Sequence, residues 1–119
     1  MREVANVNGT LSLLEDAKIP VTDRGFLYGD SLYEVIIIEN GFPIFLNEHL
    51  ERTHKSAEKM RMKLSISDEE LTEEIRRTVE FYGEKPKRVY CRWVKFDKKN
   101  KNYKEKLEGH LWNFLENPN

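Results

Sequence analysis

The stretch LYEVIIIE at residues 32–39 constrains the fold more than any other part of the chain. It is rich in β-branched and aromatic side chains, which favour strands. Asn40-Gly41 follows it directly, and this pair favours the tight turns that close β-hairpins. We therefore predict a strand over residues 32–39 and a returning strand over residues 42–46. Residues 35–38 are apolar without alternation, which predicts that both faces of the first strand are covered.

Other strands are expected where β-branched and aromatic residues gather between turn signals. These segments are residues 2–6, 10–14, 87–96 and 110–115. The first two flank Asn8-Gly9, so we predict a second hairpin there. Two polar stretches, residues 15–30 and the lysine-rich residues 97–108, are predicted to be loops.

From residue 46 onward, the spacing of apolar residues is that of a helix rather than a strand. Apolar or small residues recur at the spacing of one helix face: Leu46, Leu50, Thr53, Ala57, Met60 and Leu64. We predict that Asn47 caps this helix. A second helix is predicted to start at Ser67, because Ser67 and Glu70 have the spacing of a capping box. Gly83 is predicted to end it.

The order of these elements predicts an α+β domain. A chain order of strands, then two helices, then strands favours a mainly antiparallel β-sheet with the two α-helices packed on one face. A chain of 119 residues has the usual length of a single domain. We therefore expect residues 1–119 to form one domain.

Composition narrows the class of protein and its partners. The formal net charge is −1, so no overall field attracts nucleic acid or a membrane surface. No apolar run approaches the roughly 18–20 residues that a membrane span needs, and the N-terminus lacks the apolar region of a secretory signal. Cys91 is the only cysteine, which excludes an internal disulfide and suits a reducing compartment. We expect a cytoplasmic protein without nucleic-acid or membrane partners.

One arginine stands out on the first predicted helix. His49, Arg52 and Ser56 lie together along one edge of the apolar stripe, neither in the core nor on the solvent face. An arginine there can direct its planar guanidinium into a cleft, where it suits the paired oxygens of phosphate or carboxylate. The alternative is an ordinary arginine whose stem packs at the core boundary while its charge stays in water.

Other common catalytic patterns have little support. His49 and His54 are five residues apart, which places them on different helix faces, and no cluster of cysteine and histidine is present, so no metal site is predicted. Ser31 is not surrounded by the GxSxG motif of a nucleophile elbow. Asp23 and Asp30 are more typical of turn-stabilising aspartates than of paired acids. The glycines of DRGFLYGD lack the order of a dinucleotide-binding loop.

A longer pattern resembles a known family. DRGFLYGDSLYEV, followed by NGFPIFLNEHLERTHKSAEKM, is similar to the N-terminal small domain of the class IV, or fold-type IV, aminotransferases. These enzymes depend on pyridoxal 5'-phosphate, and the family includes D-amino-acid aminotransferase, branched-chain aminotransferase and aminodeoxychorismate lyase. The resemblance covers residues 19–62 and combines the DRGxxxGDxxYE block, the Asn-Gly hairpin and HxxRxxxSA. Among these members, the similarity to D-amino-acid aminotransferase is the strongest.

The resemblance implies roles for particular residues. The arginine of HxxR binds the cofactor phosphate in the family, so Arg52 is implied to be a phosphate ligand. Tyr33 is implied to face the cleft and to contact substrate. Glu34 is next along the strand and points to the opposite face, which suggests a structural or rim residue. The loop with Phe26 and Tyr28 is implied to lie at the cleft and dimer interface.

The resemblance also implies parts that this sequence lacks. Family members are more than twice as long, and their Schiff-base lysine lies in a larger C-terminal catalytic domain. No lysine here matches that motif, so we expect residues 1–119 to be the small N-terminal domain and to be inactive alone. The strand at 87–96 also lacks the Arg-Gly turn that usually follows it in the family, so the substrate class stays open.

Two hypotheses of different classes follow. The first is an enzyme domain or fragment, from a homodimeric aminotransferase or lyase that acts on amino acids and 2-oxo acids with pyridoxal 5'-phosphate. The second is a free-standing, non-catalytic small domain that acts as a dimerisation or interaction module. Both hypotheses predict self-association, because uncovered aromatic residues tend to find partners.

Overall fold

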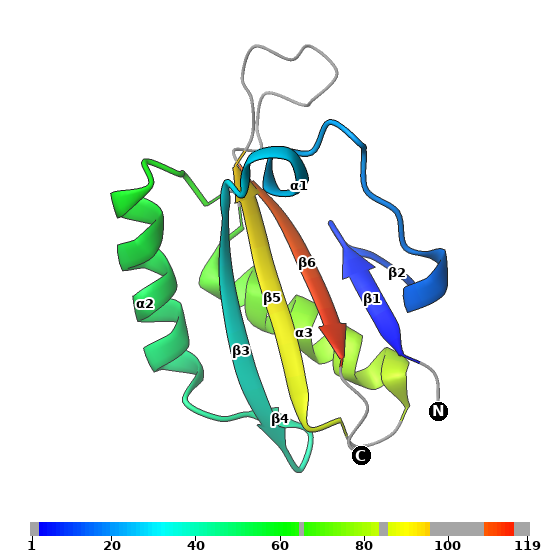
Figure 1. The fold of residues 1–119 in the computed structure, drawn as a ribbon. Coiled ribbons are helices and arrows are strands. Elements are labelled where there is room, and N and C mark those ends of the chain that lie inside the picture. The colour runs from blue at the N-terminus through cyan, green and yellow to red at the C-terminus, as the bar shows by residue number, and fades with distance from the viewer. Residues whose placement is uncertain (1–2, 65, 84–85, 96–108, 116–119) are drawn as a thin grey trace.

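In the part of the chain that the structure describes, the strands form one six-stranded sheet in the order β2-β1-β6-β5-β3-β4 (Figure 1). The computed structural model describes residues 3–64, 66–83, 86–95 and 109–115. Each neighbouring pair of strands is antiparallel. The strands are β1 (Val4–Val7), β2 (Thr10–Leu13), β3 (Ser31–Glu39), β4 (Phe42–Pro43), β5 (Arg88–Lys95) and β6 (Gly109–Leu115). The predicted α+β class with an antiparallel sheet is confirmed.

Both Asn-Gly pairs form the predicted hairpin turns. The φ angles are 53° at Asn8 and 91° at Gly9, and 52° at Asn40 and 84° at Gly41. Positive φ at both central residues is the mark of the two-residue turns that match the twist of a hairpin. The paired residues on either side of these turns close the β1–β2 and β3–β4 hairpins.

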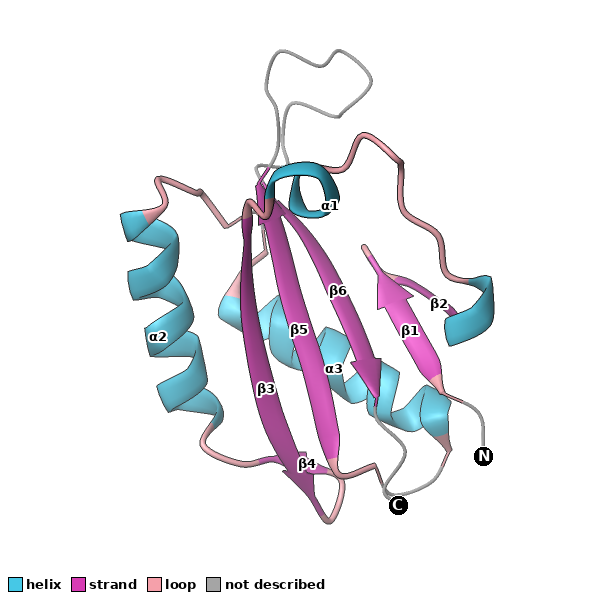
Figure 2. Ribbon diagram, in the orientation of Figure 1, coloured by secondary structure: helices cyan, strands magenta, loops and turns pink. Residues whose placement is uncertain are grey.

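The two long helices cover the same face of the sheet (Figure 2). Residues paired directly across antiparallel strands share a face, and the register places Glu34, Cys91, Asn113 and Asn6 in one row. The side chain of Glu34 hydrogen-bonds to the first long helix, and that of Asn6 to the second. These helices are α2 (Leu46–Lys59) and α3 (Asp68–Tyr82). The predicted packing of both helices on one face is therefore confirmed.

The ends of α3 also follow the prediction. The Ser67 hydroxyl accepts a hydrogen bond from the backbone N–H of Glu70, and the Glu70 carboxylate accepts one from the backbone N–H of Ser67. This reciprocal pair is a complete capping box. Gly83 ends the helix in the left-handed conformation, with φ of 79°. Glycine adopts that conformation without steric cost.

The predicted start of α2 was wrong. Asn47 does not cap the helix but lies within its first turn, because α2 begins at Leu46. Phe45 occupies the capping position in the left-handed conformation, with φ of 56°, and its side chain makes no capping hydrogen bond. This conformation turns the chain out of the sheet, so β4 contains only Phe42–Pro43 rather than the predicted residues 42–46.

Only one face of β3 is covered by the long helices, which corrects the prediction for residues 35–38. Ile36 is 1% exposed and Ile38 is also buried, whereas Ile37 is 55% exposed. Side chains alternate between the two faces of a strand, so Ile37 points away from the helices. Apolar residues at consecutive positions here reflect one buried face and one open face.

Short helices interrupt the predicted loop over residues 15–30. They are η1 (Leu14–Asp16) and α1 (Arg24–Tyr28). The buried side chain of Asp23 accepts a hydrogen bond from the backbone N–H of Phe26, and its carbonyl accepts one from Leu27. A carboxylate that binds the first free N–H groups stabilises a helix start, which explains α1. The predicted loop over residues 97–108 lies outside the described residues.

Candidate functional site

Glu34 joins the sheet to helix α2 through two basic side chains. Its side chain is 10% exposed, on the face of β3 that the long helices cover. Arg52 Nη2 donates to Glu34 Oε1 at 2.7 Å, and Arg52 Nε donates to Oε2 at 3.0 Å. Nδ1 of His49 lies 2.5 Å from Oε1. Because His49 and Arg52 are one helical turn apart on α2, both reach the same carboxylate.

The pKa of Glu34 reflects this environment. Burial alone would raise it, but the hydrogen bonds from Arg52 and then His49 outweigh burial and hold the pKa below the ordinary value. The carboxylate is therefore ionised at neutral pH, and Nδ1–H of His49 is assigned as the donor. A lowered folded-state pKa stabilises the fold above the unfolded pKa of this group. That contribution is lost as the pH falls through the lowered pKa.

Arg52 retains donors that Glu34 does not use. A guanidinium carries five N–H groups, and Glu34 engages only Nε and Nη2. Within the described part of the chain, Nη1 of Arg52 has no hydrogen-bond partner, and the side chain is 64% exposed. The position at the edge of the apolar stripe, predicted from spacing, therefore leaves one edge of the guanidinium accessible to an anion.

Tyr33 lies on the opposite, open face of the sheet. Its ring is stacked against that of Tyr90, with centroids 6.1 Å apart, and the guanidinium carbon of Arg92 lies 5.5 Å from the ring centroid. Tyr33 is half exposed. The sheet therefore separates Tyr33 from Glu34, as strand alternation predicts, and the structure does not bring Tyr33 together with Arg52.

Phe26 and Tyr28 are exposed on α1. This short helix crosses the ends of β3, β5 and β6 on the side away from α3 (Figure 1). Val94 is paired with Ser31, shares the open face with Tyr33 and is buried there, where α1 contacts β5. The two exposed aromatic residues of α1 thus border the same open face that carries Tyr33.

The pairing of Glu34 with His49 was missed by sequence reasoning. Strand alternation places Glu34 on the face opposite Tyr33, and helical spacing places His49 beside Arg52, but no local pattern connects this strand to the helix. The sequence feature that could have revealed it is Glu34 itself. This acidic residue lies on the same strand face as Ile36 and Ile38, which are buried. An ionised carboxylate at such a position requires partners.

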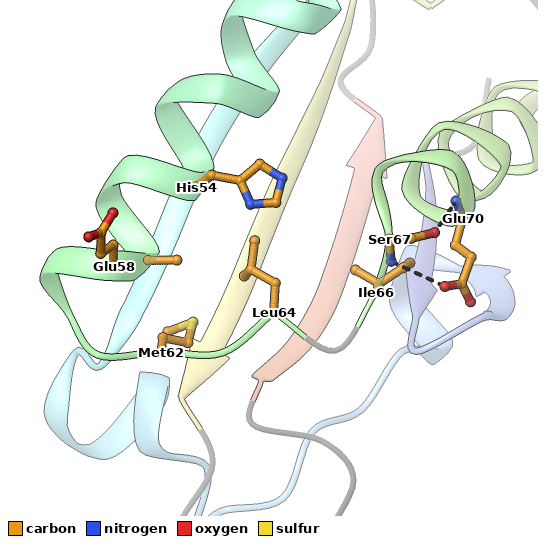
Figure 3. Close-up of a pocket in the computed structure, with 8 residues that line it drawn as sticks. His54, Glu58, Met62, Leu64, Ile66, Ser67 and Glu70 are labelled. Carbon is orange, nitrogen blue, oxygen red and sulfur yellow. Dashed lines mark hydrogen bonds between the residues drawn. The ribbon is translucent and has the colours of Figure 1, made fainter.

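A pocket of about 540 Å³ lies elsewhere, between the end of α2 and the start of α3 (Figure 3). Ala57, Met62, Leu64 and Ile66 contribute its apolar walls, and His54 is at its rim. None of the residues implied to bind cofactor or substrate lines it. We therefore do not assign the site to this pocket.

Other kinds of site have no support in the described ranges. No three histidine, cysteine, aspartate or glutamate residues there gather as metal ligands. None of the helices in those ranges has both the length and the apolar character needed to cross a bilayer. Burial, and to a lesser degree the charge of Glu34, raises the pKa of the Cys91 thiol, so Cys91 is protonated at neutral pH and is not a nucleophile.

Comparison with known protein families gives a specific match. The sequence profile described as amino-transferase class IV matches residues 31–117, which include β3, both long helices and Arg52. The chain belongs to the class IV aminotransferase family. The resemblance seen in the sequence covered residues 19–62, and the match begins later, at residue 31, but continues 55 residues further, to residue 117.

Individual relatives support this membership. The chain is 38% identical over 73 residues to a D-alanine aminotransferase from Bacillus licheniformis, which covers 61% of this chain and 26% of that protein. It is 41% identical over 71 residues to a D-alanine aminotransferase from Staphylococcus epidermidis, covering 60% of this chain and 25% of that protein. The chain thus spans about a quarter of the length of these class IV relatives.

A solved structure has the same fold. The branched-chain amino acid aminotransferase from Escherichia coli aligns with a TM-score of 0.69 and 25% identity. The alignment covers 95% of this chain and 40% of that protein. The fold of this class IV chain therefore corresponds to one part of a larger aminotransferase, in agreement with the small-domain resemblance.

Proposed function

We propose that this chain is the small domain of a pyridoxal 5'-phosphate-dependent class IV aminotransferase or related lyase, in which Arg52 binds the cofactor phosphate. The observation that carries the proposal is the accessible edge of the Arg52 guanidinium, held in place by Glu34. A planar pair of N–H donors fits two phosphate oxygens. The donor chemistry of Arg52 therefore suits the cofactor phosphate.

The cofactor, when bound, supplies the electron sink for moving an amino group between an amino acid and a 2-oxo acid. The residues of this chain would bind and orient its phosphate. On this proposal Tyr33 contacts substrate, since its phenol can donate a hydrogen bond to a substrate carboxylate. The names of the D-alanine aminotransferase relatives support amino-acid substrates. The Schiff-base lysine would lie in the part of such enzymes that these residues do not span.

Substitution of Arg52 tests the phosphate site. In the full-length gene product, Arg52→Ala is expected to weaken binding of pyridoxal 5'-phosphate by about ten- to a hundredfold, because a hydrogen bond to a charged group contributes roughly 1.5–3 kcal/mol. Arg52→Lys is expected to restore only part of the affinity, since it lacks the planar pair of donors. The dissociation constants are measured by titration followed by cofactor absorbance.

The matched control is Arg76→Ala. Arg76 is also an exposed helical arginine paired with glutamates, but it lies on α3. Its substitution is expected to leave the cofactor affinity unchanged. An Arg52→Ala variant that folds normally and binds pyridoxal 5'-phosphate as tightly as the wild type would remove Arg52 from the site.

A second candidate function is that of a non-catalytic interaction module. The observation that favours it is the open sheet face, where Tyr33 is half exposed and the exposed Phe26 and Tyr28 lie at the border. Contiguous exposed apolar residues mark surfaces that bind partners. Under either candidate function we propose that this face takes part in a homodimer.

Self-association is tested by sedimentation velocity over a range of concentrations. We expect a dimer whose dissociation constant rises in the double variant Phe26→Ser and Tyr28→Ser, because two exposed aromatic contacts are lost. Phe81→Ser is the control, since Phe81 is also an exposed aromatic residue but lies on α3, which covers the other face of the sheet (Figure 1). A clean monomer at high protein concentration would contradict self-association.

A further inference from the structure

The carboxylate of Glu34 occupies an unusual position for a charged group. Its side chain is nearly buried on the helix-facing side of β3, in the same row as the fully buried Cys91. An ionised carboxylate is removed from water only at a cost unless charged or hydrogen-bonding partners compensate. Arg52 and His49 provide this compensation, and both come from α2. Glu34 is thus held in a single place by two donors.

The same contacts restrict the guanidinium of Arg52. Arg52 Nε lies 3.0 Å from one carboxylate oxygen of Glu34, and Nη2 lies 2.7 Å from the other. Two parallel hydrogen bonds fix both the position and the plane of the guanidinium. Nη1, which Glu34 does not bind, is thereby turned away from Glu34. An exposed arginine without such a partner would sample many rotamers.

We propose that Glu34, supported by His49, is a positioning residue that presents the Nη1 edge of Arg52 to the cofactor phosphate. This inference rests on the proposed function, in which Arg52 binds that phosphate. Ordering a flexible side chain at a binding site costs affinity, and an arginine already ordered in the free protein avoids that cost. The role of Glu34 is therefore to raise phosphate affinity through Arg52, without contact with the phosphate.

One opposing effect has to be weighed. The negative charge of Glu34 also repels phosphate, which would make removal of Glu34 favourable for binding. Glu34 binds Nε and Nη2, whereas on this proposal the phosphate is bound through Nη1, and the Arg52 side chain between them is largely solvent-exposed. Water and salt weaken such a repulsion. His49 shares the same carboxylate oxygen, so its hydrogen bond to Glu34 offsets part of the charge. We therefore expect the ordering effect to dominate.

The experiment compares two ligands that differ only in the phosphate. The full-length gene product is titrated with pyridoxal 5'-phosphate and with pyridoxal. Glu34→Gln is expected to weaken binding of pyridoxal 5'-phosphate by about two- to tenfold, the range for ordering one flexible side chain. Binding of pyridoxal should not change. A purely structural role for Glu34 would change both affinities or neither.

Two further variants separate this inference from the proposed function. In an Arg52→Ala background, Glu34→Gln should have no additional effect on phosphate-dependent affinity, because residues that act through one another are not additive. Glu73→Gln is the control, since Glu73 also pairs with an arginine, but on the exposed side of α3. If Arg52→Ala loses affinity and Glu34→Gln does not, the positioning role is wrong and the phosphate site stands. If Arg52→Ala itself has no effect, both are wrong.

A measurement on the unmodified protein covers the case in which Glu34→Gln does not fold. The Nε–H of Arg52 should give a resolved nuclear magnetic resonance signal that exchanges slowly with water in the cofactor-free protein, because it is bonded to Glu34. The exposed Arg61 is the internal reference for fast exchange. Exchange of the Arg52 Nε–H as fast as that of Arg61 would overturn the positioning role.

Discussion

Pyridoxal 5'-phosphate added to the 119-residue chain near neutral pH is expected to form no one-to-one covalent adduct with a lysine, and no amino acid should be turned over. Attack on the cofactor aldehyde needs a neutral amine, which enzymes obtain by desolvating a lysine or placing it near another cation. Every lysine whose side chain the structure describes is exposed instead: Lys18, Lys55, Lys59, Lys63 and Lys87. These side chains lie at the surface rather than in a desolvated site.

The test is a titration followed by borohydride reduction and mass analysis of peptides. Solvent-exposed amines should give low, scattered labelling spread over several lysines. The remaining lysines lie mostly in the stretch that the sequence predicts to be a charged loop, and we expect the same of them. A single lysine modified at one equivalent, or measurable conversion of an amino acid by the 119-residue chain, would contradict this expectation.

A large loss of stability is expected when the core between β3 and α2 is truncated. Ile36→Ala should lower the free energy of unfolding by about 2–5 kcal/mol, because it removes buried methyl groups and leaves a cavity. Ile36 is paired with the fully buried Val89 and packs in the same core as Leu50 of α2. Domains of ordinary stability have only about 5–15 kcal/mol in total. This substitution should therefore remove a large share of the stability.

Ile37→Ala is the matched control, since it is the same substitution one residue along β3 on the open face. Its cost should stay below about 1 kcal/mol, the span of intrinsic strand preferences. Urea unfolding monitored by circular dichroism gives both values. Equal losses for Ile36→Ala and Ile37→Ala would mean that the two faces of β3 are equally covered, contrary to the structure.

Features that depend on a few neighbouring residues were predictable from the sequence. The turns at Asn8-Gly9 and Asn40-Gly41 were correct because each turn is determined by its two central residues. The capping box at Ser67 was correct for the same reason. The predicted start of α2 was wrong, because the left-handed conformation of Phe45 has no signature in the sequence. Asn47, a polar residue of the type that often caps helices, was predicted instead.

Features that depend on contacts between elements were less predictable. Consecutive apolar residues on β3 could not reveal which face the helices cover, so the exposure of Ile37 was missed. At the candidate site, helical spacing placed Arg52 at the edge of the apolar stripe. It could not show that Glu34 reaches both Arg52 and His49, because that contact joins a strand to a helix. Strand alternation did predict that Tyr33 and Glu34 lie on opposite faces.

The most direct test of the phosphate site is a crystal structure of the full-length gene product grown with pyridoxal 5'-phosphate. We predict a phosphate oxygen at about 2.7–2.9 Å from Nη1 of Arg52, the usual distance for a charge-assisted hydrogen bond. Nε of Arg52 should keep its contact with Glu34. A structure in which the cofactor is bound, but its phosphate is held by other groups while Arg52 contacts only Glu34, would contradict the proposed function of Arg52.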